Sequence, residues 1–116
     1  MRGDYPAAET AFTEFLDKYV EDDRASDAQY WLGESLLIQE AYPEATEAYV
    51  TLVSTWPQAE KAPDAFIKLA RALRMMGQKA EACEALSQAS KLYPKAGPVI
   101  RSSIARERDR AECNGA

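Results

Sequence analysis

Apolar side chains recur every three or four positions along most of this chain, which is the period of an amphipathic helix. No segment shows the strict alternation that is typical of a half-buried strand. The predicted helices span residues 5–20, 27–40, 42–55, 64–76, 79–93 and 98–112. Because short connections join most of them, consecutive helices are expected to pair as antiparallel hairpins. The pattern therefore predicts an all-α fold.

Small residues mark the expected helix ends. Ser26 or Asp27 can cap the second predicted helix by accepting hydrogen bonds from its first backbone N–H groups. Gly77 suits the left-handed conformation that commonly ends a helix. Gly33 is different, because it lies inside a predicted helix, where glycine costs about 1 kcal/mol relative to alanine. Close approach of a neighbouring helix is the expected reason for it.

The stretch YPEATEAYVTLVSTWP, residues 42–57, has related copies 37 positions earlier and 37 positions later. The three copies share a small residue at Ala8, Ala45 and Ala82 and a large apolar residue at Phe12, Tyr49 and Leu86. An aromatic residue followed by proline closes the last two copies, whereas the first copy has Tyr19-Val20. Self-similarity at a fixed period indicates a repeat architecture.

The spacing of Gly33, Ala45, Tyr49 and Pro57 resembles the tetratricopeptide repeat, W-x2-L-G-x2-Y…A-x3-F…P. The period is three residues longer than the usual 34, which fits a longer linker. The resemblance implies a right-handed superhelix of antiparallel helix hairpins with a C-terminal capping helix. The expected parts of one domain, 1–116, are the second helix of a truncated first repeat at 1–20, full repeats at 27–57 and 63–94, and the capping helix at 98–112.

Three further features narrow the resemblance: AQYWLGE at 28–34, APDAFIKLA at 62–70 and a second cysteine close to the end of the chain. With the aromatic-proline helix ends, they resemble the C-terminal domain of the Tol-Pal system YbgF family, also called the cell division coordinator CpoB family. This resemblance implies a non-enzymatic periplasmic adaptor without cofactor. Its implied partners are TolA, as a Tol-Pal component, and a peptidoglycan synthase.

Full-length members of that family carry a signal peptide and a trimeric coiled coil before the repeat domain. The chain is therefore expected to be a fragment that lacks the first helix of its first repeat. The apolar face of Phe12 and Phe15 would then lack its usual partner, and self-association through it is expected.

Composition excludes several classes of function. The net charge of −5 disfavours binding to nucleic acid and to anionic lipid. The absence of histidine excludes His-based acid–base catalysis, His metal sites and Ser-His or Cys-His nucleophile pairs. Two cysteines without histidine are too few for a zinc site. No apolar run approaches the roughly 18 residues of a membrane span.

A tetratricopeptide hairpin lines a concave groove with the first helix of each repeat. The family's groove positions map onto Asp27, Tyr30, Glu34, Leu37 and Ile38 in one helix and Asp64, Ile67, Arg71, Arg74 and Met75 in the next. Most successive members are three or four residues apart, so each set shares one helix face. This mapping gives the predicted partner-binding groove.

The groove is expected to combine exposed apolar residues, Leu37, Ile67 and Met75, with the cations of Arg71 and Arg74. Guanidinium groups in a groove suit a peptide or helix that carries carboxylates. In the alternative interpretation, the two arginines pair with Glu34 or Glu81 on a solvated surface.

Other conspicuous residues have simpler interpretations. The aromatic side chains of Trp31, Trp56 and Tyr93 are interpreted as packing between repeats rather than as ligand-stacking groups. The run RERDRAE, residues 106–112, carries both signs of charge and is interpreted as a solvated helix face.

Cys83 lies about eleven residues before the turn between the last two predicted helices and Cys113 about sixteen after it, so their heights differ by about 7 Å. A disulfide is thus geometrically feasible. The periplasmic location that the resemblance implies favours it, while two unlinked thiols remain the alternative.

Two other functions compete with the adaptor. One is a structural subunit or lipoprotein scaffold of an outer-membrane protein assembly, similar to YfiO/BamD-type repeats. The other is a repeat domain attached to a cell-wall hydrolase. Sequence upstream of Met1 would separate them, because a coiled coil, a lipobox cysteine and a catalytic domain each point to a different one of the three.

Overall fold

The computed structural model describes residues 10, 11, 13, 14 and 24–113. Its full helices are α2 (Ala25–Ile38), α3 (Tyr42–Thr55), α4 (Ala62–Met75), α5 (Lys79–Leu92) and α6 (Pro98–Arg110). Residues 10, 11, 13 and 14 are also helical, and the described part of the chain contains no strand. The rest of predicted helix 5–20, with Phe12 and Phe15, lies outside the described residues. The predicted all-α class is confirmed.

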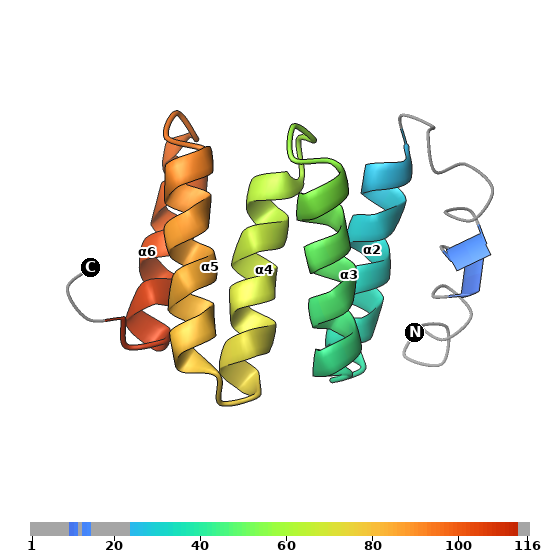
Figure 1. Cartoon of the computed structure of the whole chain (residues 1–116), viewed down its shortest axis with the longest axis horizontal. Coiled ribbons are helices and arrows are strands. Elements are labelled where there is room, and N and C mark those ends of the chain that lie inside the picture. The colour runs from blue at the N-terminus through green and yellow to red at the C-terminus, as the bar shows by residue number, and fades with distance from the viewer. Residues whose placement is uncertain (1–9, 12, 15–23, 114–116) are drawn as a thin grey trace.

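The helices form a row of antiparallel hairpins (Figure 1). Helix α2 packs against α3 and α4 against α5, and α3 joins the two hairpins by packing against α4. Helix α6 packs against both α4 and α5 and covers the end of the stack. Because each hairpin buries its apolar face mainly against its neighbours in the chain, the molecule is a short superhelix of stacked repeats.

The two aromatic-proline helix ends connect consecutive repeats. The Tyr93 hydroxyl donates a hydrogen bond to the carbonyl oxygen of Pro57, 2.6 Å away. The ring of Tyr93 also meets Phe66 edge-on, with 6.0 Å between ring centroids. Burial raises the pKa of the Tyr93 hydroxyl, which favours its role as a donor. Tyr93 is thus a packing residue, as interpreted from the sequence.

Gly33 is required by the packing of α2 against α3. Tyr49 of α3 is fully buried, with 0% of its surface exposed. A Cβ atom added to Gly33 would lie 2.5 Å from Cε1 of the Tyr49 ring, much closer than real Cβ contacts. The close approach that the mid-helix glycine predicted is therefore present, and the neighbour is the aromatic residue of the same repeat.

Gly33→Val is expected to lower the free energy of unfolding by about 1–3 kcal/mol, the usual cost of overpacking a well-packed core. The Tyr49 ring cannot easily move away, because it is enclosed on all sides. Urea unfolding followed by circular dichroism measures the loss. Ser90→Val, at an exposed position of α5, introduces the same side chain without the clash and should leave the stability nearly unchanged.

The two helix ends predicted from small residues have different outcomes. Gly77 has φ of +79°, and the N–H of Gln78 donates to the carbonyl of Leu73 at 2.9 Å, which makes a Schellman cap. The predicted capping by Ser26 or Asp27 is wrong. Helix α2 begins earlier than predicted, so both residues lie in its first turn, and Ser26 is buried there.

Candidate functional site

The ten predicted groove residues lie on α2 and α4, but not all of them face solvent. Ile67 was expected to be exposed and is only 4% exposed, because it packs in the core that also holds Ile104 of α6. Leu37 is half-buried against the same core rather than exposed. Tyr30 is buried as well. These three residues stabilise the stack and leave little side-chain surface for a partner.

The exposed apolar residues of the predicted groove lie at the ends of the two helices. Ile38 is the last residue of α2 and Met75 the last residue of α4, and both side chains are exposed. Figure 1 shows the two helices ending at the same edge of the stack. Asp27 is exposed and Asp64 partly exposed, both in the first turns of these helices. The predicted groove is therefore acidic where α2 and α4 begin and apolar where they end.

Glu34, midway along α2, belongs to an internal network. It accepts a hydrogen bond from the Tyr49 hydroxyl at 3.2 Å and forms an ion pair with Lys68 at 3.1 Å. Burial, together with the charge of Glu34, raises the pKa of Tyr49 well above its usual value. Burial and a hydrogen bond to Glu34 do the same for the pKa of Tyr30. Both phenols therefore stay protonated, and Glu34 is the partner of Lys68 rather than of an arginine.

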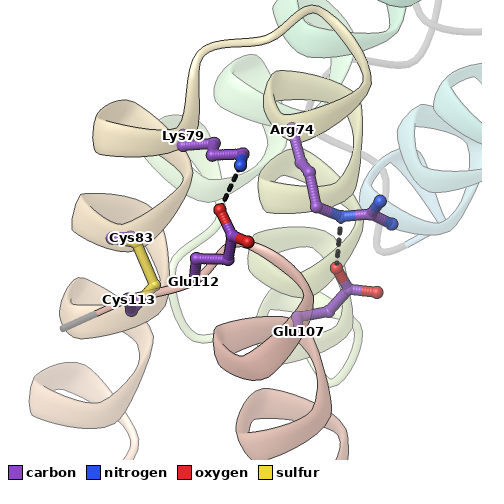
Figure 2. The surroundings of a disulfide bond; sticks show 6 residues. All are labelled: Arg74, Lys79, Cys83, Glu107, Glu112 and Cys113. Atoms are coloured by element: carbon purple, nitrogen blue, oxygen red, sulfur yellow. Dashed lines mark hydrogen bonds and ion pairs between the residues drawn. A yellow bond between two sulfur atoms is a disulfide. The ribbon is translucent and has the colours of Figure 1, made fainter.

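Three arginines surround one buried carboxylate, Glu107 of α6. The Nε atoms of Arg71 and Arg74 lie 3.2 and 3.4 Å from its two oxygens, and Nη1 of Arg110 lies 3.1 Å from one of them. The Glu107 side chain is only 2% exposed, whereas all three arginines reach solvent. Figure 2 shows Glu107 reaching from α6 towards Arg74 on α4. Together, Arg71, Arg74, Arg110 and Glu107 form the arginine cluster.

The arginine cluster corrects two interpretations of the sequence. Arg71 and Arg74 pair with neither Glu34 nor Glu81, and their partner comes from the run 106–112, which was interpreted as a solvated face. A signal for Glu107 was present, because Ile100, Ile104, Glu107 and Ala111 follow one another at helical spacing. The many charged residues of the run 106–112 make this buried face of the helix hard to recognise from the sequence.

The arginine cluster carries an excess of positive charge, with three guanidinium groups around one carboxylate. Glu107 accepts one hydrogen bond from the Nε–H of Arg71 and one from the Nε–H of Arg74. The terminal nitrogens of these two arginines make no hydrogen bond within the described part of the chain. Such free N–H donors match the geometry of an incoming carboxylate or phosphate.

The aromatic residues interpreted as packing groups separate into two kinds. Trp56 and Tyr93 pack against the core. Trp31 does not fit that interpretation, because it is 46% exposed on the surface of α2. The ammonium group of Lys61 lies 5.5 Å from the centroid of the Trp31 ring and 5.3 Å from that of Tyr30, within the range of a cation–π contact.

Cys83 of α5 and Cys113, which follows α6, form a disulfide with their Cα atoms 5.7 Å apart. Beside the disulfide, Lys79 forms an ion pair with Glu112 (Figure 2). The hydrogen bond from Lys79 lowers the pKa of Glu112. The structure thus has the bridged form of the two cysteines, and the bridge holds the end of α6 against α5.

No group of three or more potential ligand residues that could hold a metal ion occurs in the described ranges, 10–11, 13–14 and 24–113. In the same residues, no helix combines the length and the apolarity that crossing a membrane requires.

Two matches to protein-family models agree with the helical hairpins. Residues 2–63 match one model described as tetratricopeptide repeat, and residues 64–96 match a second model with the same description. The first match alone covers more than half of the 116 residues. No match was found among curated protein sequences. The chain therefore belongs to the tetratricopeptide repeat family.

Proposed function

We propose that this domain is a non-enzymatic protein-binding module of the periplasm, acting as a Tol-Pal-associated adaptor of the YbgF/CpoB type. In this role it coordinates outer-membrane constriction with peptidoglycan synthesis during cell division. Membership of the tetratricopeptide repeat family supports the general part, because such repeats typically bind proteins. The motifs AQYWLGE and APDAFIKLA support the specific part.

The arginine cluster is the observation that carries the binding site. The overall charge of the chain is −5, yet this part of the α4–α6 surface has an excess of cations. The free terminal nitrogens of Arg71 and Arg74 can form charge-assisted hydrogen bonds with carboxylates of a partner. Exposed Met75, one residue from Arg74, adds an adaptable apolar contact. The partner segment is therefore an acidic peptide or helix.

The Cys83–Cys113 bridge supports the periplasmic location, since disulfides persist in oxidising compartments and are rare in the cytosol. TolA, as the Tol-Pal component, and a peptidoglycan synthase are the proposed partners. Of the remaining groove residues, exposed Ile38 at the end of α2 would extend the contact with the partner, whereas Asp27 and Asp64 lie in the first turns of α2 and α4, at the opposite ends of these helices from Ile38 and Met75.

Arg71→Gln combined with Arg74→Gln is expected to weaken the complex with purified TolA about 10- to 100-fold, the typical effect of losing hydrogen bonds to charged groups. Isothermal calorimetry of the wild type and the double variant measures this change. Neutral glutamine is chosen because a charge reversal would place a second carboxylate beside Glu107 and disturb the fold.

The matched control is Lys91→Gln with Lys95→Gln, which removes the same charge from exposed positions near the end of α5. This control should bind TolA as the wild type does. Equal affinities for the arginine double variant and the wild type would remove Arg71 and Arg74 from the binding site. Absence of wild-type binding to TolA would reject TolA as the partner.

A further inference from the structure

We propose that Glu107 is the positioning residue of Arg71 and Arg74, and that the Cys83–Cys113 disulfide makes this positioning depend on the redox state of the chain. The inference rests on the proposed function, which assigns the two arginines to partner binding. It adds a means of regulation to that same site.

The first step is the way in which Glu107 holds the arginines. Each of its two oxygens accepts the Nε–H of a different arginine, Oε2 from Arg71 and Oε1 from Arg74. In Figure 2 the terminal nitrogens of Arg74 point away from Glu107. A long side chain that is fixed before binding loses less conformational entropy when a partner arrives. Glu107 therefore prepares the arginine pair for an acidic ligand instead of competing for its free donors.

The second step is that Glu107 belongs to α6, which is the least packed of the helices α2 to α6. Helix α6 is last in the stack, and its main packing partners among the described residues are α4 and α5. Among the described residues from 98 to 113, the buried ones are Ile104, Ala111 and Glu107 itself. Burying a carboxylate is unfavourable unless its partners offset the loss of hydration. Because α6 makes few apolar contacts and buries one charge, its position depends strongly on any further bond to its neighbours.

The third step is that the disulfide supplies this link. It joins Cys113, just beyond the end of α6, to Cys83 in the first half of α5. Among the described residues, the only other side-chain polar contact beyond the end of α6 is the Lys79–Glu112 ion pair, in which both side chains are exposed. Exposed ion pairs contribute little to stability. The covalent bridge is therefore the strongest side-chain link between α5 and the end of α6, one to two turns beyond Glu107.

Reduction of the bridge would release this restraint. A dithiol reductant supplies two electrons and two protons, the S–S bond breaks, Cys83 and Cys113 become thiols, and the reductant is oxidised to its own disulfide. The last turn of α6 can then fray, and the hydrogen bonds from the Nε–H groups of Arg71 and Arg74 to Glu107 are lost. Arg71 and Arg74 remain on α4 but lose their fixed orientation.

The test is nuclear magnetic resonance of the arginine Nε–H groups in the oxidised wild type, with assignment from Arg71→Gln and Arg74→Gln. Both signals should be protected from solvent exchange. Glu107→Gln should speed their exchange about tenfold or more, and so should treatment of the wild type with dithiothreitol. Glu112→Gln, which removes only the exposed pair, is the control and should change neither signal.

The outcomes separate the parts of the inference. Unchanged exchange of both arginines in Glu107→Gln would overturn the positioning role. Faster exchange in Glu107→Gln but unaltered exchange after reduction would overturn the redox dependence. The reduced wild type gives a second measurement if the variant does not fold. TolA titrations of the same samples test the proposed function separately, because the exchange rates are read without any partner.

Discussion

Replacing Tyr49 with alanine is expected to lower the free energy of unfolding by about 3–5 kcal/mol, the range for removing a large buried aromatic side chain. Tyr49 lies at the centre of the first described hairpin and is fully enclosed. Its ring fills the space opposite Gly33, and its hydroxyl donates to Glu34. The variant therefore creates a cavity and removes a donor from a partly buried carboxylate.

Urea unfolding monitored by circular dichroism measures this loss, and Tyr49→Phe separates its two parts. The phenylalanine variant keeps the ring and should lose only about 0.5–1.5 kcal/mol, the net value of one hydrogen bond. The cavity also predicts coupling, because Gly33→Val should cost much less in the Tyr49→Ala background than in the wild type. A loss below about 1 kcal/mol for Tyr49→Ala would contradict the central packing role.

Much of the fold could be predicted because local signals and tertiary packing agree in the repeats. Helix α3 has its predicted bounds, since Pro43 suits its first turn and Pro57 disfavours helical geometry at Trp56. Gly33 indicates a close helix contact from its position in the sequence alone, and the neighbour is Tyr49. Where a single local signal was used alone, as for the cap at Ser26, the burial of that residue in the first turn took precedence.

The candidate site could be predicted only in part, because it depends on which helix covers which residue. Repeat positions identified Arg71 and Arg74, since the pattern determines their helix face. Sequence spacing does not reveal that α6 folds back onto α4, so the burial of Ile67 and the pairing with Glu107 were missed. Trp31 shows the same limit, because its neighbours in the stack decide its exposure.

Removal of the disulfide, by reduction or by Cys83→Ser with Cys113→Ser, is expected to lower the free energy of unfolding by about 3–4 kcal/mol. The reason lies mainly in the unfolded chain, which gains conformational entropy when a crosslink between residues 30 positions apart is absent. Urea unfolding curves with and without dithiothreitol measure the difference. Thiol titration of denatured, unreduced protein should find almost no free cysteine.

The double serine variant also serves as the control for the reductant. Dithiothreitol should destabilise the wild type and leave the variant unchanged, because the variant has no S–S bond to break. An effect on both proteins would mean that the reductant acts elsewhere. Two titratable thiols per chain in the unreduced protein would exclude the bridge, and the dependence of the arginine cluster on redox state would be excluded with it.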